Sequence, residues 1–271
     1  MRHYRLTPAF SMLELIFVIV ILGIVASIGS ELIAKVYESY IVQRAQHNAT
    51  LKTELAAAQI ANRLASAIPG TVYRITNGNT YESIESNLGS PDGDNYKGLQ
   101  WVGSDAESFN ATDRPGWSGF CDINTSTQTN LSTPGSDLGM TNTIIAKLSN
   151  NTKNISNAAI YFPDDSIEHN ISAGIGELLT LDGTGATRIV EHYKLAWSSY
   201  ALVVENGDLF LYYNFDPTPA VALGATKSLL MKNVATFKFQ GGGRTLRFKI
   251  CKHERISEDV NITACKEKAV F

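Results

Sequence analysis

The residue types that carry most enzyme chemistry are scattered along this chain of 271 residues, without the spacing that a catalytic or metal site usually shows. The five histidines are far apart and give no His-x-x-x-His or Cys/His pattern of a zinc site; they are His3, His47, His169, His192 and His253. The chain contains neither a Gly-x-Ser-x-Gly nucleophile elbow nor a Gly-x-x-x-x-Gly-Lys-Ser/Thr phosphate loop. A triad assembled from distant residues would leave no such signature. We predict no catalytic residues, no cofactor and no enzyme activity.

Two acidic clusters have the hard oxygen ligands that calcium prefers. One is Asp92-Gly93-Asp94-Asn95, and the other is Asp164-Asp165 with Glu168. Neither follows the twelve-residue ligand pattern of an EF-hand loop. We interpret both as solvated turn residues, with calcium binding as the alternative, and predict no metal site.

One acidic side chain lies in an apolar segment, where a charged group is costly in free energy. Glu14 stands near the start of an apolar run that continues through Ile28. A charge at the centre of a bilayer costs roughly 2.5–3.5 kcal/mol on insertion scales, so an acid in such a segment is expected to have a partner. Cleavage between Ala9 and Phe10 would create an amino terminus within one helical turn of Glu14, in its own chain or in a packed neighbour.

The N-terminal stretch, from residue 2 to about residue 35, resembles the prepilins, the precursors of type IV pilins and of type II secretion pseudopilins. The resemblance rests on a short basic leader, a small residue before the cleavage site, an aromatic first residue, an acid at the fifth position and a glycine at the fourteenth: Arg2, Arg5, Ala9, Phe10, Glu14 and Gly23. Two positions depart from the family. Ala9 replaces the usual glycine, and Glu31 stands where a proline often kinks the helix, so no kink is expected there.

This resemblance implies that prepilin peptidase removes residues 1–9 and methylates the amine of Phe10. The mature subunit would be held in the inner membrane, with its C-terminal domain in the periplasm, and would be drawn by an inner-membrane assembly platform into a fibre of packed helices. Glu14 would neutralise the amino terminus of the adjoining subunit. In the size of its body, the chain is most similar to a minor component such as the J-type pseudopilin or its pilus equivalent. The presence of Glu14 argues against the tip subunit, which commonly lacks this residue.

Among the three cysteines, the resemblance favours a disulfide between Cys251 and Cys265, since many pilins tie their C-terminal region in this way. A loop of this length contributes roughly 3 kcal/mol in the chain-entropy model. Cys121 is then left as a buried small hydrophobic residue, with a reactive or intermolecular thiol as the alternative.

Two alternatives exist for the N-terminal segment. A plain single-pass anchor also needs about 20 apolar residues, but leaves Glu14 unexplained. A secretory signal peptide requires a cleavage site after the apolar core, and no Ala-x-Ala triplet is present there. Arg2 and Arg5 precede the span, so the positive-inside rule places the leader in the cytoplasm.

A binding role is the alternative function: a minor pilin whose exposed loops bind DNA or a surface. Cations on the second predicted hairpin would form a basic face, from Lys232, Lys238, Arg244, Arg247 and Lys249. The net charge of −3 argues against nucleic acid as a dominant partner.

The helix and strands expected from the sequence predict an α+β fold, in which a long N-terminal helix packs on an antiparallel sheet with long loops. We expect a transmembrane segment at residues 10–30, an amphipathic continuation at 31–68 and a β-rich globular domain at 69–271. The helix is expected to end at Ala67, before Pro69-Gly70. Its buried stripe is predicted from apolar residues at steps of three to five: Leu51, Leu55, Ile60, Leu64 and Ile68.

Two hairpins are expected in the β-rich part. Asn206-Gly207 joins strands 201–205 and 208–213, because Asn-Gly supplies the positive φ of a tight turn, and Gln240–Gly243 joins 234–239 to 244–250. Further strands are predicted at 71–76, 158–162, 178–181 and 188–193. Residues 77–157, rich in Asn, Ser, Thr, Gly and Asp, are predicted to be surface loops with a few short elements.

Overall fold

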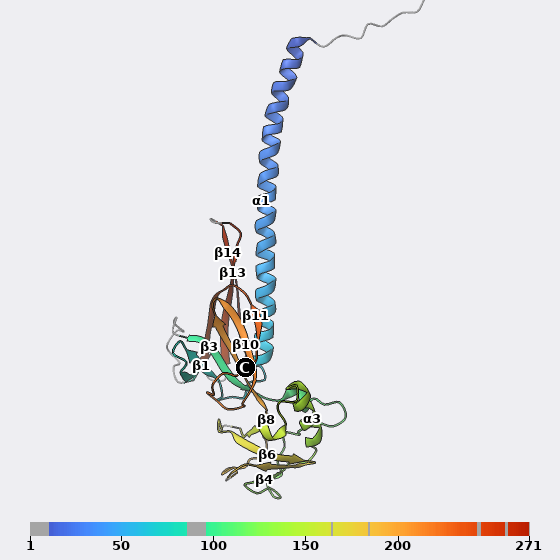
Figure 1. The fold of residues 1–271 in the computed structure, drawn as a ribbon, viewed down its shortest axis with the longest axis vertical. Coiled ribbons are helices and arrows are strands. Elements are labelled where there is room, and N and C mark those ends of the chain that lie inside the picture. Colours follow the sequence, from blue (N-terminus) through green and yellow to red (C-terminus); the bar gives the residue numbers. More distant parts are fainter. Residues whose placement is uncertain are drawn as a thin grey trace, which may run out of the picture.

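The computed structural model describes residues 11–85, 96–163, 165–183, 185–242, 245–257 and 260–270. Its fold is α+β, as expected: a long apolar helix and three antiparallel sheets (Figure 1). Helix α1 (Met12–Leu64) has 53 residues. At 1.5 Å per residue it is about 80 Å long. Its N-terminal part projects away from the β-structured body, and its C-terminal part lies along it (Figure 1).

Helix α1 ends three residues earlier than predicted. Ala65 caps it in the right-handed helical region, with its N–H bonded to the carbonyl groups of Ala61 and Arg63. The next residues join a sheet instead: Ala67 forms a bridge with Gly103, and the Ile68 N–H donates to the Val102 carbonyl at 2.9 Å. Pairing with a strand therefore competes with the last helical turn before Pro69.

The largest sheet has six strands in the order β11-β10-β9-β3-β1-β2. They are β1 (Tyr73–Thr76), β2 (Tyr81–Ser83), β3 (Tyr96–Gly103), β9 (Ser198–Glu205), β10 (Asp208–Phe215) and β11 (Lys227–Met231). The β9–β10 hairpin is confirmed, with Asn206 at φ 52° and Gly207 at φ 81° in its turn. Two positive φ angles are what a tight hairpin turn of this kind requires.

A second sheet has the order β12-β13-β14 and lies beside α1 (Figure 1). It consists of β12 (Val234–Gly242), β13 (Thr245–Arg255) and β14 (Asn261–Val270). The predicted hairpin between β12 and β13 is confirmed, although residues 243–244 of its turn lie outside the described residues. The main core is enclosed by α1 and these two sheets, and includes Ala56, Ile60, Leu64, Trp101, Leu202 and Phe248.

The chain between β3 and β9 forms a separate lobe at the end of the body away from the projecting helix (Figure 1). It contains a five-stranded sheet in the order β4-β7-β6-β5-β8: β4 (Asn130–Ser132), β5 (Ala159–Tyr161), β6 (His169–Ile175), β7 (Leu178–Leu181) and β8 (Lys194–Ala196). Helices α2 (Ala106–Phe109), α3 (Leu138–Leu148) and the 3-10 helix η1 (Ile155–Asn157) complete it. The lobe has its own buried cluster, around Trp117, Leu131, Ile145 and Leu195.

Residues 77–157 contain more regular structure than the predicted surface loops with a few short elements, so this prediction was wrong for part of the segment. Strand β3 occupies the interior of the six-stranded sheet, where Trp101 is fully buried. Helix α3 begins at the N-cap Asp137, whose carboxylate accepts from the Met140 N–H at 3.1 Å.

The separate strand predictions had mixed outcomes. The structure confirms strands within 71–76 and 158–162 and over 178–181, as β1, β5 and β7. A strand at 188–193 is wrong, since β8 starts only at Lys194 and His192 forms just an isolated bridge with Phe120.

Candidate functional site

Glu14 lies in the first turn of α1, where Ser11 caps the helix. The Glu14 N–H is 3.3 Å from the Ser11 hydroxyl and 3.1 Å from the Ser11 carbonyl oxygen. Ser-x-x-Glu is the spacing of a helix-capping signature, and an acid here also interacts favourably with the helix dipole. The sequence therefore contained a further signal for the helix start. The Glu14 side chain is exposed and has no ionic partner within the described part of the chain.

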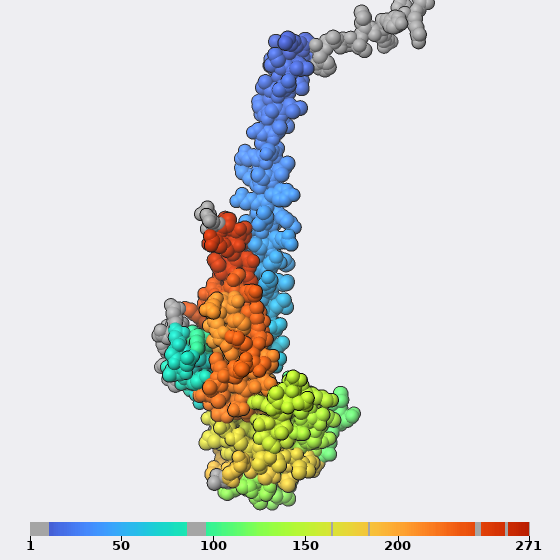
Figure 2. All heavy atoms as spheres, viewed as in Figure 1, coloured from blue at the N-terminus to red at the C-terminus, as the bar shows by residue number. Residues whose placement is uncertain are grey.

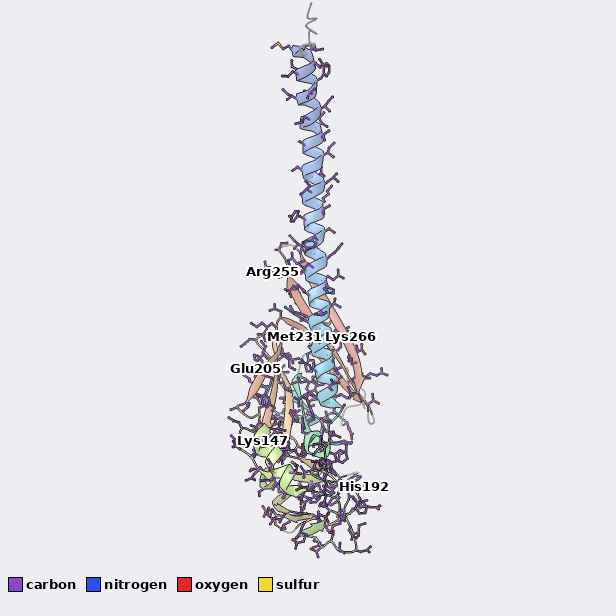
Figure 3. The ribbon with its side chains drawn as sticks, turned by 90° about the vertical axis from the view of Figure 1, so that its right-hand side faces the viewer. Lys147, His192, Glu205, Met231, Arg255 and Lys266 are labelled. Carbon is purple, nitrogen blue, oxygen red and sulfur yellow. A yellow bond between two sulfur atoms is a disulfide. The ribbon has the colours of Figure 1, made fainter. Side chains whose placement is uncertain are left out.

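The N-terminal two thirds of α1 is uncovered by the rest of the chain. The first buried residue of the helix is Ala49. From Met12 to Ile41, the large apolar side chains are between 48% and 86% exposed. They project on all sides of a bare helix (Figures 2 and 3). This helix is long and apolar enough to cross a membrane. Exposed apolar surface on this scale marks a membrane or protein interface.

Gly23 forms a notch in this apolar surface. A Cβ atom added at Gly23 would have no heavy atom within 4 Å, and the same holds for Gly29. Neither glycine is therefore required by packing inside this chain. Small residues on an apolar helix allow close approach of another helix in a membrane.

The C-terminal third of α1 is fixed to the three-stranded sheet. Glu54 accepts from Lys266 at 2.6 Å and lies 3.8 Å from Lys268, both on β14 (Figure 3 labels Lys266 beside the helix). The Thr53 hydroxyl donates to the Ala264 carbonyl at 3.5 Å. The lysines lower the pKa of the exposed Glu54 carboxyl, the hydrogen bond from Lys266 contributing most.

The predicted buried stripe was partly wrong. Ile60 and Leu64 are buried, but Leu51 is 51% and Leu55 is 56% exposed. The helix instead presents small side chains to the sheet upstream of Ile60: Ala49, Thr53, Ala56 and Ala57. Small residues allow the helix to lie close to the strands, whereas Leu51 and Leu55 extend the apolar surface of α1 onto the outward side.

The cysteines follow the expected arrangement. Cys251 on β13 and Cys265 on β14 are directly opposite each other, with Cα atoms 4.0 Å apart, and form a disulfide. This bond ties β14, which carries the lysines that contact Glu54, to the rest of its sheet. Cys121 is free and fully buried, with its Sγ 3.4 Å from the Ser126 hydroxyl. Burial raises the pKa of the Cys121 thiol.

The acidic clusters give no metal centre in the described ranges, where no group of three or more His, Cys, Asp or Glu side chains is placed to hold an ion. Asp92, Asp94 and Asp164 lie outside those ranges. Asp165 instead accepts from the Ile167 N–H at 2.9 Å and lies 3.7 Å from His169 Nε2. Burial is the main cause of a raised pKa at Glu168.

The cations of the second hairpin share one face of the three-stranded sheet. Lys238 on β12 is directly opposite Lys249 on β13, and Gln240 is opposite Arg247. Alternation along the strands places all four on the side away from Phe248 and α1. Glu267 on β14 is opposite Lys249 on the same face. Arg244 lies outside the described residues, and Lys232 is exposed in the turn before β12.

The predicted processing site, Ala9 and Phe10, lies outside the described residues. Comparison with family models, with curated proteins and with solved structures finds no match to this chain. The function is therefore inferred from the sequence and from the geometry of α1.

Proposed function

We propose that this chain is a minor pilin or pseudopilin subunit, which is processed by prepilin peptidase between Ala9 and Phe10, inserted in the inner membrane and assembled into a type IV pilus or a type II secretion pseudopilus. The observation that carries the proposal is the uncovered apolar part of α1, with one acid, Glu14, in its first turn. A plain anchor accounts for the apolar helix but assigns no role to this acid.

The dimensions of α1 support this role. The segment that precedes the first buried residue, Ala49, runs from Met12 to Asn48. At 1.5 Å per residue it is about 55 Å long, whereas the hydrocarbon core of a bilayer is about 30 Å thick. The remaining length would hold the body off the membrane surface. From residue 31 to residue 48 this stretch mixes polar with apolar residues, and it includes a Glu31–Lys35 ion pair at 2.7 Å.

In the proposed fibre, Glu14 pairs with the amino terminus of the adjoining subunit. A buried charge that lacks its partner costs several kcal/mol, so a subunit in the wrong axial register is disfavoured. The contacts of Thr53 and Glu54 with β14 fix the body to the same helix. The register of the helices therefore also sets the positions of the bodies around the fibre.

The test is a Glu14→Ala variant expressed in the native host, with Glu31→Ala as the matched control. Both remove one exposed acid from α1, but only Glu14 lies within the apolar segment. We expect both variants to insert in the membrane and to fold, and only Glu14→Ala to be missing from sheared fibres. Incorporation of Glu14→Ala at the level of the parent would contradict the pairing mechanism.

The face that carries Lys238, Arg247 and Lys249 supports a second candidate function, DNA binding by a minor pilin. Cross-strand pairing brings these cations together although they come from different strands. Retention of the protein on DNA should then fall steeply as salt is raised, and a Lys238→Gln, Lys249→Gln double variant should reduce that slope. Salt-independent retention would exclude phosphate contacts as its cause.

A further inference from the structure

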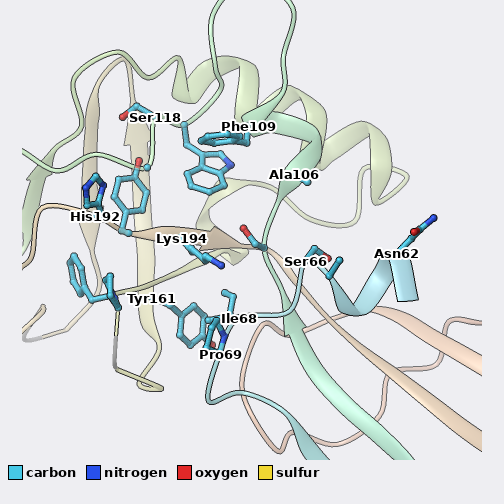
Figure 4. A pocket seen from close by; sticks show the side chains of 17 residues that line it. Asn62, Ser66, Ile68, Pro69, Ala106, Phe109, Ser118, Tyr161, His192 and Lys194 are labelled. Atoms are coloured by element: carbon cyan, nitrogen blue, oxygen red, sulfur yellow. The ribbon is translucent and has the colours of Figure 1, made fainter. Parts of the chain in front are cut away.

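An open cleft lies where the end of α1 meets the inserted lobe. Its volume is about 720 Å³. This is within the range of small-molecule sites, roughly 300–1,000 Å³. One wall comes from the end of α1 and the turn after it, with Ser66, Ile68 and Pro69. The lobe contributes Tyr161 beside Ile68, and Phe109 across the space from them (Figure 4).

Several aromatic residues line the lobe side of the cleft. The ring centroids of Phe109 and Trp117 are 4.8 Å apart, and those of Trp117 and Tyr193 are 5.8 Å apart. The Trp117 indole N–H donates to the Asp105 carbonyl at 2.9 Å, which fixes the ring plane. Phe109 is 44% exposed. An aromatic ring that is exposed inside a recess, next to ordered rings, provides a surface on which another flat apolar group can pack.

Lys194 is the only formally charged residue among the 17 that line this cleft. Its side chain enters the space between Phe109 on one side and Ile68 and Tyr161 on the other (Figure 4). In the described part of the chain no carboxylate pairs with it. Lys194 is an exposed residue, but partial desolvation of its ammonium group lowers the pKa of that group. A cation among apolar walls is stabilised by a bound anion.

We propose that this cleft binds a small aromatic carboxylate, whose acid group pairs with the Lys194 ammonium and whose ring packs on Phe109 and Trp117. The positive charge of Lys194 disfavours a cationic ligand. A neutral apolar ligand would fill the space but leave the ammonium group desolvated without a partner. The proposal is independent of the fibre function, because the cleft is lined by the C-terminal end of α1 and by the lobe, and not by the apolar N-terminal part of α1.

The test compares two probes that differ only in charge, 4-phenylbutyrate and 4-phenylbutanamide. Each is titrated calorimetrically into the full-length protein in detergent micelles, with protein-free micelles as the blank. We expect the carboxylate to bind at least about tenfold more tightly than the amide, since a hydrogen bond to a charged group is worth this much. Equal affinities, or no binding of either probe, would overturn the proposal.

Variants locate the site. Lys194→Gln should reduce carboxylate affinity to that of the amide and leave amide affinity unchanged, whereas Lys194→Arg should retain the preference. Lys147→Gln, which removes an exposed lysine of the same lobe outside the cleft, is the matched control and should bind like the parent. Phe109→Ala should weaken both probes. A Lys194→Gln protein that is folded and still prefers the carboxylate would refute the role of Lys194.

Discussion

The orientation of α1 on the body can be tested with two alanine substitutions that lie five residues apart. Ile60 is 1% exposed and packs in the main core with Trp101 and Leu202. Leu55 is 56% exposed, although its spacing predicted a buried residue. Truncation of a buried isoleucine to alanine costs about 2–5 kcal/mol, because it removes apolar contacts and leaves a cavity. An exposed position away from special features changes stability by about 0.5 kcal/mol or less.

We therefore expect Ile60→Ala to lower the free energy of unfolding by at least about 1.5 kcal/mol more than Leu55→Ala does. The assay is urea unfolding of the full-length protein in micelles, followed by tryptophan fluorescence and circular dichroism. The dependence on urea should be the same for both variants, so that the midpoints report stability directly. A loss at Leu55 equal to the loss at Ile60 would show that the helix is rotated relative to the structure. In the proposed fibre, Leu55→Ala should instead weaken subunit association.

Two further predictions concern the body. Replacement of both Cys251 and Cys265 by serine should lower the free energy of unfolding by about 3 kcal/mol, since the disulfide closes a short loop. Denaturant unfolding measures this change. A stability equal to that of the parent would mean that the disulfide does not constrain the unfolded chain. Burial raises the pKa of Asp105, despite the hydrogen bond that its carboxyl accepts from the Ser108 N–H at 3.1 Å. The stability that Asp105 contributes is therefore complete below the ordinary Asp pKa, and it is lost as the pH rises through the folded-state pKa. Asp105→Asn retains a capping acceptor and does not titrate, so its stability relative to the parent should increase as the pH is raised above the ordinary Asp pKa. A difference that is constant with pH would contradict this reasoning.

Features with a local cause were predictable from the sequence. The long helix follows from an unbroken run of apolar and helix-forming residues, and the β9–β10 hairpin follows from Asn206-Gly207. The disulfide expected from the family resemblance joins Cys251 to Cys265 across neighbouring strands. In each case a few adjacent residues, or one family motif, carried enough information.

Features that depend on distant partners were missed. Strand β3 has Gly98 and polar residues among its apolar ones, and it becomes a central strand only because β1 and β9 pair with it on either side. The apolar spacing of Leu51 and Leu55 fitted a buried stripe, but the close approach of β14 selects the alanines on the other side of the helix. The cleft around Lys194 combines α1 with a lobe that begins forty residues later, so no local pattern indicated it.

The N-terminal sequence and intact mass of the protein recovered from membranes of its native host test the central proposal most directly. The account predicts a chain that starts at Phe10 and carries one methyl group on its amine. An intact Met1 would contradict prepilin processing and favour a plain anchor, and a start near Ser30 would show that the apolar segment is a signal peptide.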